Sequence, residues 1–527
     1  MDAIWQLSAR ELAARIAKGE ISAMDAVDAH IARIQAVNPA LNAVCWTRYD
    51  EARSEAKLAD EAIANGEKLG PLHGVPITIK ECLDLEGSPS TFGLPSRAST
   101  AADRDGIYVD RLRKAGAIVL GKTNVSQLLM FVEADNPLYG RTNNPWSVER
   151  SPGGSSGGQA AILAAGGSLL GLGTDIGGSN RVPAAFCGIV GMKATAGRFA
   201  DPGRFSLPAG QRAIPSQVGV FSRDVGDLNL GMAVIHGGRA PDGHSPAPLV
   251  DPFTVDLKSL RVAWFTDDGT FTASPAARRA VTDAAKMLAD RGANVFEWSP
   301  PDIGQAISML YGIFSADGAA GLSRALGKDP RDPRIRQIEQ AAGAPSWMMP
   351  VLRKILTMLG RKKSADILAN YGRHDTDWYW QISERLMDYQ SRWKRALDES
   401  PSGPIDLILS PSAALPAVRH GATLELGVLG GYSCLYNVLG YPAGIVPITT
   451  IGNHEESDRA PSSDKMDVTA RETERGSAGL PMTVQVAARP WQEHNALAAM
   501  KAIEESAKTR ADYPALTKLW AAMADNP

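Results

Sequence analysis

The pattern of apolar and polar positions changes near residue 70 of this chain. Up to that point apolar residues recur at helical spacing, and two helices are expected to open at Ser8 and Ser22, each with an acidic residue three positions later. From about 71 to 230, short apolar runs alternate with Gly and Pro turns, which predicts strands separated by helices. We therefore expect an N-terminal helical segment at 1–70 and a main α/β domain at 71–510.

The apolar runs of the main domain give the positions of individual elements. Helices are expected after the Ser274-Pro275 pair and at 109–115, 157–165 and 181–187. Strands are expected at 75–79, 118–120, 261–265, 405–409, 445–448 and 482–486. This alternation predicts an α/β sheet.

Two stretches depart from the sheet pattern. Residues 305–400 are helical in pattern and predict a helical insertion or lid, whereas 452–476 is polar and charged and predicts a mobile surface loop. Within the insertion, 345–363 is apolar with interspersed basic residues. It is either a lid over a hydrophobic pocket, an element that touches a membrane surface, or a helix packed on the body. We favour packing over membrane contact, and a lid role fits either.

Composition narrows the class of protein. The chain has 527 residues with 44% hydrophobic and 21% charged residues, which is ordinary for a globular enzyme. Its net charge of −3 favours neither nucleic acid nor anionic lipid. No secretory signal is visible, and the most apolar stretch, 160–173, is too short to span a bilayer. Four cysteines form no CxxC pair, so we expect reduced thiols and a cytoplasmic protein.

The candidate chemistry lies in two Gly/Ser clusters and one lysine. Ser155 and Ser179 lie 24 residues apart, each surrounded by glycines, and Lys80 ends the apolar run 75–79. Glycine lets backbone N–H groups approach an oxyanion closely. An apolar setting lowers the pKa of a lysine and makes its neutral amine a usable general base. These are the parts of a nucleophilic acyl-transfer site that needs no histidine.

Other interpretations of the clusters fit less well. Both Ser155 and Ser156 satisfy G-x-S-x-G, but a nucleophile elbow follows a buried strand, and the preceding run 143–150 is polar and broken by a proline. The elbow also needs a downstream histidine, for which only His454 and His494 are available. The phosphate-loop pattern G-x-x-x-x-G-K-[ST] is absent at both clusters. A plain flexible turn would be the favoured interpretation of one isolated cluster, but it fits two clusters less well when each is followed by a helix.

The same residues resemble a known family. The runs Gly153–Gly158 and Gly171–Gly188 are similar to the signature of the amidase signature family. Further similar stretches lie at 74–80, 121–124, 144–146, 435–437, 441–447 and 479–486. The C-terminal stretches most resemble the fatty-acid amide hydrolase branch, and 305–400 is the least similar part. The resemblance implies an amidase signature fold, a large mixed β-sheet flanked by helices, with a helical insertion.

The resemblance also assigns roles to single residues. Ser179 matches the family's nucleophile, Ser155 its bridging serine and Lys80 its base. The backbone donors of the oxyanion hole correspond to Ile176, Gly177 and Gly178. Residues that support the site through hydrogen bonds correspond to Ser156, Asp175 and Arg181. The acyl channel of the fatty-amide branch corresponds to Leu129 and Met130, which plain core packing explains equally well. Asn180 departs from the family, which usually has an apolar residue there.

The implied mechanism is a Ser-Ser-Lys relay. Neutral Lys80 accepts a proton from Ser155, which takes one from Ser179, and Ser179 then attacks the carbonyl. Water cleaves the resulting acyl-enzyme. No cofactor and no metal is implied, and the eight histidines show no HxH or HExxH spacing.

We therefore expect a serine amidohydrolase for amides with apolar or aromatic groups, with ester and carbamate (urethane) cleavage left open. The alternative is the glutaminase subunit of a tRNA-dependent amidotransferase, which would need partner chains and a route for ammonia. A non-catalytic binding protein is disfavoured because Lys80, Ser155 and Ser179 are all present. The expected partner is a small-molecule amide or carbamate and not nucleic acid, and membrane contact is not expected. A homodimer stays open.

Overall fold

The computed structural model describes residues 3–199, 210–236, 247–345, 347–427 and 429–525. Within these residues eleven strands form one mixed sheet in the order β1-β3-β2-β4-β6-β5-β10-β11-β9-β7-β8. The strands are β1 (Val44–Thr47), β2 (Pro76–Lys80), β3 (Ile118–Thr123), β4 (Leu170–Asp175), β5 (Val190–Lys193), β6 (Gln217–Ser222), β7 (Arg261–Trp264), β8 (Asn294–Glu297), β9 (Leu407–Pro411), β10 (Ala443–Thr450) and β11 (Pro481–Ala488).

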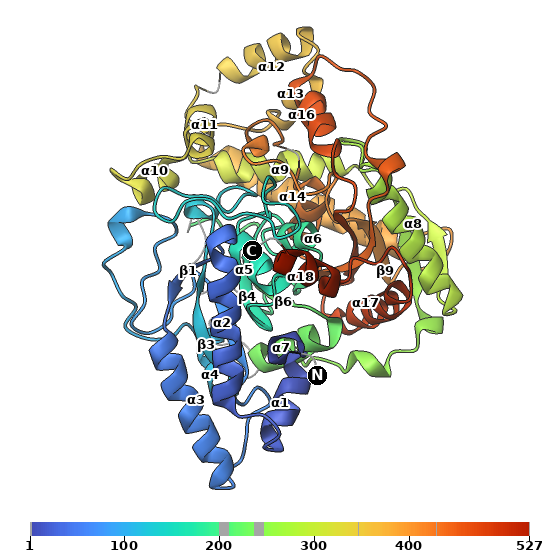
Figure 1. Cartoon of the computed structure of the whole chain (residues 1–527). Helices are drawn as coiled ribbons and strands as arrows, with labels where there is room; N and C mark the ends of the chain where they lie inside the picture. The colour runs from blue at the N-terminus through green and yellow to red at the C-terminus, as the bar shows by residue number, and fades with distance from the viewer. Residues whose placement is uncertain (1–2, 200–209, 237–246, 346, 428, 526–527) are drawn as a thin grey trace.

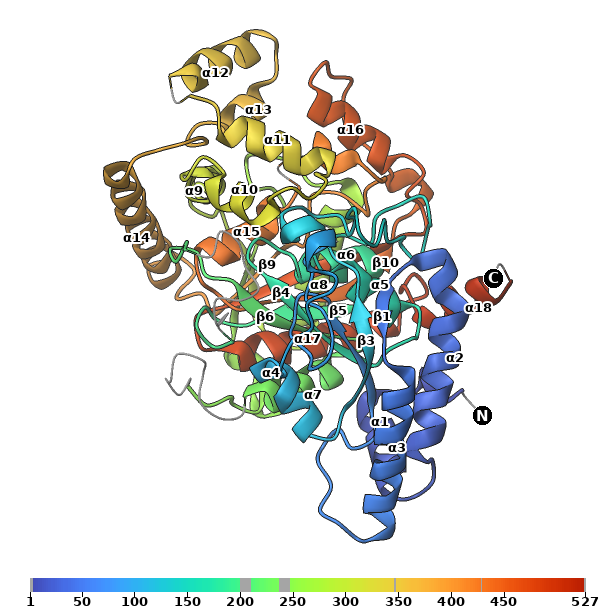
Figure 2. The same cartoon turned by 90° about the vertical axis from the view of Figure 1, so that its left-hand side faces the viewer.

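Helices surround this sheet in both views (Figures 1 and 2). Among the described residues they are α1 (Ala9–Ala17), α2 (Ala23–Leu41), α3 (Tyr49–Ala64), α4 (Ile107–Lys114), α5 (Gly157–Ala164), α6 (Arg181–Cys187), α7 (Val225–His236), α8 (Pro275–Asp290), α9 (Ile303–Ser315), α10 (Ala320–Leu326), α11 (Pro333–Ala342), α12 (Met348–Met358), α13 (Lys362–Ile367), α14 (Thr376–Asp398), α15 (Gly431–Val438), α16 (Lys465–Glu474), α17 (Glu493–Lys508) and α18 (Leu516–Asp525). None of them is long and apolar enough to cross a membrane.

The centre of the sheet positions the site. Strand β2 runs parallel to both of its neighbours, β3 and β4, so these three strands end at the same edge. All three are buried along their whole length. Strands covered on both faces often form continuous apolar runs, and the runs at β2 and β3 were predicted as strands. Strand β4, whose sequence is interrupted by Gly171 and Gly173, was not predicted.

Most of the predicted elements are confirmed. Each predicted strand and helix of the main domain is found, with ends displaced by a few residues at most, and α6 matches the predicted 181–187 at both ends. Ser8 and Ser22 cap their helices, because their Oγ atoms accept from the N–H groups of Glu11 and Asp25. The expectation of helices alone over 1–70 missed β1, which pairs antiparallel with β3. A strand of four residues is too short to show an alternating pattern.

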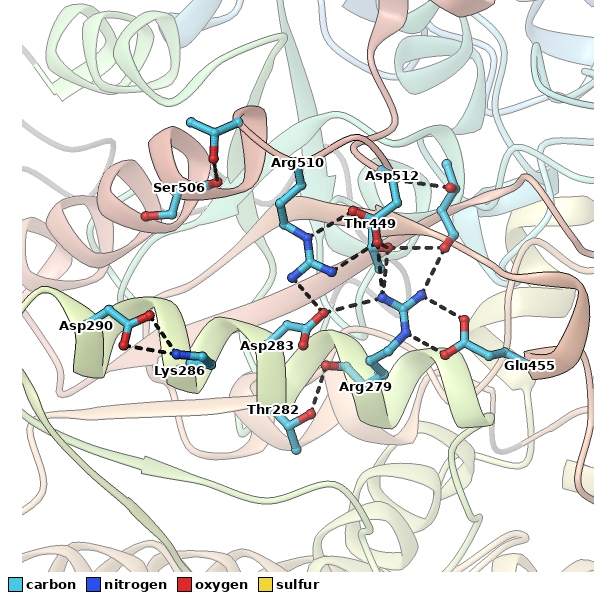
Figure 3. Close-up of polar contacts among 12 residues, drawn as sticks. Arg279, Thr282, Asp283, Lys286, Asp290, Thr449, Glu455, Ser506, Arg510 and Asp512 are labelled. Atoms are coloured by element: carbon cyan, nitrogen blue, oxygen red, sulfur yellow. Dashed lines mark hydrogen bonds and ion pairs between the residues drawn. The ribbon is translucent and has the colours of Figure 1, made fainter.

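The prediction of a loop throughout 452–476 was wrong, because this stretch contains helix α16. Hydrogen bonds and ion pairs between charged side chains stabilise this stretch, whereas most helices pack through an apolar face. Glu455 accepts from the guanidinium of Arg279 on α8, which also binds Thr449 and Asp512 (Figure 3). Arg459 donates to Glu474 at 2.8 Å. Ion pairs leave no periodic apolar signal, so polarity alone suggested a loop.

The predicted insertion is helical, and α9 to α14 occupy it. Helix α12 lies at the outer edge of the molecule in both views (Figures 1 and 2). Its Met349 is buried, but large apolar side chains on the rest of its surface are exposed: Trp347, Met348, Val351, Leu352, Ile355, Met358 and Leu359. Residue 346 of the 345–363 segment lies outside the described residues.

Candidate active site

Lys80 ends strand β2 and is fully buried. Its Nζ donates to the hydroxyl of Ser155 at 2.7 Å and to the hydroxyl of Thr174 at 2.7 Å. Burial lowers the pKa of the Lys80 amine to about 8, since the loss of water outweighs the charges of nearby acidic groups such as Asp175. At pH 7 about one tenth of this amine is therefore neutral and available as a base.

Ser155 lies in the turn that leads into helix α5. The Gly154–Ser155 peptide bond is cis, and Gly153 has a positive φ of 85°. The side chain of Ser155 is fully buried, with the Lys80 amine as its partner. The turn thus points a hydroxyl at the end of β2.

Ser179 lies in the turn between β4 and α6 and is 8% exposed. Gly178, at φ +98°, brings this turn so close to α15 that a Cβ there would lie 2.7 Å from the Cβ of Ser433. The N–H of Ser156 donates to the carbonyl of Ser179 at 3.3 Å, which joins the two Gly/Ser clusters. No hydrogen bond joins the hydroxyls of Ser155 and Ser179, both of which the structure describes.

The backbone N–H groups around Ser179 differ in whether they have a hydrogen-bond acceptor. The N–H of Gly178 donates to the carboxylate of Asp175 at 2.8 Å. Among the described residues, no acceptor faces the N–H groups of Ile176, Gly177 or Ser179. Ile176 and Gly177 are also partly exposed. These groups are therefore free to bind an oxyanion.

A buried ion pair supports the nucleophile turn. Arg181 contacts both oxygens of Asp175 at 3.0 Å, and neither side chain is exposed. Arg181 also donates to Asn437 on α15 and Gln485 on β11, each at 2.7 Å. Burial would raise the pKa of Asp175, but the charge and hydrogen bonds of Arg181 outweigh it and hold that pKa well below its ordinary value. The pair thus fixes the turn to elements far along the chain.

Asn180, which departs from the family pattern, points into the sheet. Its Nδ2 donates to the carbonyls of Met192 at 3.3 Å and Val220 at 3.2 Å. Glycines on two strands leave room for it, since a Cβ on Gly173 would lie 2.6 Å from its Oδ1 and one on Gly219 2.6 Å from its Cγ. Its Oδ1 is buried without a partner in the described part of the chain. The amide therefore bridges β5 and β6 beneath the nucleophile turn.

Other predicted positions are less tightly tied to the serines. The hydroxyl of Ser156 reaches the carbonyl of Thr174 at 3.5 Å. Leu129 and Met130 are half-buried and packed against the main core, and Leu129 has a positive φ of 62°. Their place in a substrate pocket stays a prediction.

Sequence reasoning missed several polar partners. Thr174, which holds the Lys80 amine, lies inside the second Gly/Ser cluster and could have been found there. Asn437 and Gln485 lie more than 250 residues from Arg181 and carry no local chemical signal. Within the described residues, no group of three or more His, Cys, Asp or Glu side chains is placed to hold a metal ion. None of the four cysteines, all of which lie among the described residues, forms a disulfide.

The fold and the site share a clear arrangement: a mixed α/β sheet with a buried lysine amine beside the hydroxyl of a serine in a Gly/Ser cluster. The Amidase family model matches residues 25–497, and the chain belongs to this family of amide hydrolases.

Known proteins similar to this chain include two groups with different named activities, fatty-acid amide hydrolases and amidotransferase subunits. Fatty-acid amide hydrolase 1 of Sus scrofa is 33% identical over 507 residues, covering 94% of this chain and 84% of that protein. The solved structure of a fatty acid amide hydrolase superposes with a TM-score of 0.82 at 26% identity, covering 95% of this chain and 85% of that one. In the second group, a glutamyl-tRNA(Gln) amidotransferase subunit of Acidothermus cellulolyticus is 38% identical over 329 residues, which cover 62% of this chain and 64% of that protein.

Proposed function

We propose that this protein is a serine amidohydrolase that cleaves amides with apolar or aromatic groups through Lys80, Ser155 and Ser179. One observation carries the proposal: the buried Lys80 amine lies 2.7 Å from the Ser155 hydroxyl and has a pKa of about 8. Among the described residues this amine is bonded to two hydroxyls and to no carboxylate, so no ion pair holds it in the charged form.

The first step is activation of the nucleophile. Neutral Lys80 accepts the proton of Ser155 while Ser155 accepts the proton of Ser179, and the Ser179 Oγ bonds to the carbonyl carbon. Thr174 accepts an N–H of the amine at 2.7 Å and keeps the lone pair directed at Ser155. The relay therefore moves one proton from Ser179 to Lys80.

The oxyanion that forms needs donors in place before the reaction. The N–H groups of Ile176, Gly177 and Ser179 supply them, each contributing about 3 kcal/mol to lowering the barrier. Gly178 takes a different role from the one that the family resemblance suggested, because its N–H holds Asp175. Its contribution is to fix the turn.

Collapse of the tetrahedral intermediate breaks the C–N bond. Ser155 passes a proton to the leaving amine and regains one from Lys80, which leaves an acyl group on Ser179. Water then attacks the acyl-enzyme by the same relay. An aryl carbamate or an ester presents the same carbonyl to the same donors, so we include both as substrates.

The relatives support the proposed substrate class. The fatty-acid amide hydrolase match extends over 94% of this chain, whereas the match to the amidotransferase protein ends at 62%. The greater identity in the latter match, 38%, keeps a glutaminase as the second candidate.

The test is a series of p-nitroanilides of increasing acyl length, with an aryl carbamate and glutamine alongside and Ser179→Ala as the blank. We expect kcat/KM to rise with acyl length and to vanish in Ser179→Ala. Preference for short acyl groups or the carbamate would indicate a compact pocket. Ammonia release from glutamine alone would favour the amidotransferase function, and full activity of Ser179→Ala would refute the proposal.

A further inference from the structure

A single arginine of the helical insertion reaches towards the catalytic centre. Arg334, at the start of α11, is 7% exposed. Its guanidinium lies 2.8 Å from the carboxylate of Asp135 and 3.2 Å from that of Glu133, and its Cζ lies 4.1 Å from the ring centre of Phe131. The neighbouring Asp332 binds the same guanidinium at 2.6 Å. Arg334 thus contacts three residues of the segment 131–135.

Glu133 connects this segment to a third part of the chain. Its carboxylate is almost fully buried and accepts from the N–H of Gly421 at 2.8 Å and from the N–H and hydroxyl of Thr423 at 3.1 and 2.5 Å. The insertion, the segment 131–135 and the turn at 421–423 therefore meet at one carboxylate. Arg334 supplies the cation that balances it.

The segment 131–135 packs directly on the backbone next to Ser155. A Cβ on Gly154 would lie 2.5 Å from the backbone N of Glu133 and 2.8 Å from the carbonyl oxygen of Phe131. A Cβ on Gly157 would lie 2.7 Å from the Cβ of Ala134. Because these backbone contacts are so close, a shift of the segment 131–135 would displace the peptide that carries Ser155.

The insertion makes a second contact with this part of the chain, at Gln127. Gln127 donates to the carbonyl of Pro330 at 2.7 Å and accepts from the N–H of Asp332 at 2.8 Å. The chain leading into α11 is therefore bound both before and after Leu129 and Met130. This part of the insertion is fixed to the catalytic centre, in contrast to α12.

We propose that Arg334 is a positioning residue for the reaction: through Glu133 and the segment 131–135 it sets the position of Ser155 relative to Lys80. The inference rests on the proposed role of Ser155. Its consequence is that the insertion helps to position the groups of the proton relay, in addition to any part it has in binding substrate.

The test compares Arg334→Met with a matched control, Arg331→Met. Arg331 lies three residues earlier and pairs with Glu339 inside the insertion at 2.7 Å. Active sites are titrated with a fluorophosphonate, and kcat, KM and the midpoint of the pH–rate profile are measured per titrated site, with Tm recorded for each variant. We expect Arg334→Met to lower kcat per site about 10- to 100-fold and to move the midpoint, because a small misplacement of a relay group is costly. Arg331→Met stays within twofold of wild type.

A double variant separates positioning from general loss of stability. Without Arg334 the Glu133 carboxylate is buried without its cation, whereas glutamine at 133 needs none and still accepts from Thr423. Arg334→Met/Glu133→Gln should therefore regain at least threefold of the lost kcat. Should Arg334→Met not fold, Arg334→Lys, which keeps one charge, is expected to show the same losses in smaller measure.

The proposal is overturned if Arg334 variants lower only Tm and the number of titratable sites, with kcat and pH midpoint per site unchanged. It is also overturned if the separate effects of Arg334→Met and Glu133→Gln on kcat simply multiply in the double variant. Failure of the underlying mechanism is distinguished by Ser155→Ala on the same substrate, because full turnover there refutes the relay whatever Arg334 does.

Discussion

The nucleophile segment 170–188 and helix α12 of the insertion are opposites in how they are held. In the former nearly every residue is buried, and its charged groups, Asp175 and Arg181, are fully paired. In α12 only Met349 is buried, and apolar side chains such as Trp347, 72% exposed, face solvent. Close backbone contacts and buried ion pairs permit one geometry, as a proton relay requires. Substitutions on a helix with one buried side chain are expected to cost little stability.

The largest effect is expected where the relay begins. Lys80→Met should lower kcat/KM about 100- to 10,000-fold, the usual contribution of a general base. The matched control is Lys122→Met, since Lys122 is buried on the adjacent strand β3 but donates to the carbonyl of Pro89 and the hydroxyl of Ser90. Steady-state kinetics per titrated site should leave Lys122→Met within a fewfold of wild type. Equal losses in both variants would mean that burial of a lysine, and not its place in the relay, matters.

The buried ion pair should affect stability more than any exposed pair. Asp175→Asn leaves the guanidinium of Arg181 without its counter-charge and should lower the free energy of unfolding by about 3–5 kcal/mol, measured by urea denaturation. Asp290→Asn removes the exposed pair with Lys286 on α8 (Figure 3) and should cost no more than about 1 kcal/mol. Similar costs for the two would show that the nucleophile turn is not specially fixed.

The pH dependence reports the charge of Lys80. Its pKa is lowered to about 8, and the reaction needs the neutral amine. The value of kcat/KM should therefore rise about tenfold per pH unit below 8 and level off above it. Because the unfolded chain has an ordinary lysine pKa and binds more protons between about 8 and 10.5, this group also makes stability rise with pH across that window. A flat profile from pH 6 to 9 would contradict the assignment of the base.

The smallest effect is expected at the exposed face of α12. Serine at Trp347, Val351, Ile355 and Met358 together should leave Tm unchanged within about 2 °C, since these side chains face solvent. If the segment is a lid, kcat/KM for the longest acyl substrate should fall several-fold relative to the shortest. The control replaces exposed Leu58 and Phe253, which lie outside the insertion. Unchanged relative rates would count against the lid.

Sequence reasoning succeeded where the cause of structure is local. Helix α6 was predicted at both ends, because the second Gly/Ser cluster lies just before it and Gly188, at φ +65°, ends it. Buried strands such as β2, β3 and β9 were predicted from their apolar runs, whereas the equally buried β4, β5 and β6 were missed. The roles of Lys80, Ser155 and Ser179 came from the family resemblance, because neither spacing nor composition places Lys80 beside Ser155 across 75 residues.

The contact of Arg334 and helix α16 were not predicted, because both depend on charged partners that lie far away in the sequence or give no apolar pattern. The contact between Glu133 and Arg334 joins residues 201 positions apart, and an isolated arginine in a helical pattern predicts only a solvated face. Helix α16 was missed for the same reason, since Arg459 and Glu474 stabilise its surroundings without an apolar pattern. Charged residues that pair in the folded protein but lie far apart in the chain produce no periodic pattern in the sequence.

The central claim is that Ser179 is the nucleophile and that Lys80 and Ser155 activate it. The most direct measurement is peptide mapping by mass spectrometry after reaction with a fluorophosphonate, with the rate of labelling followed in wild type and Lys80→Met. The account predicts one adduct, on Ser179, formed at least about 100-fold more slowly in Lys80→Met. An adduct on Ser155 or Ser156, or equal labelling rates in the two proteins, would contradict it.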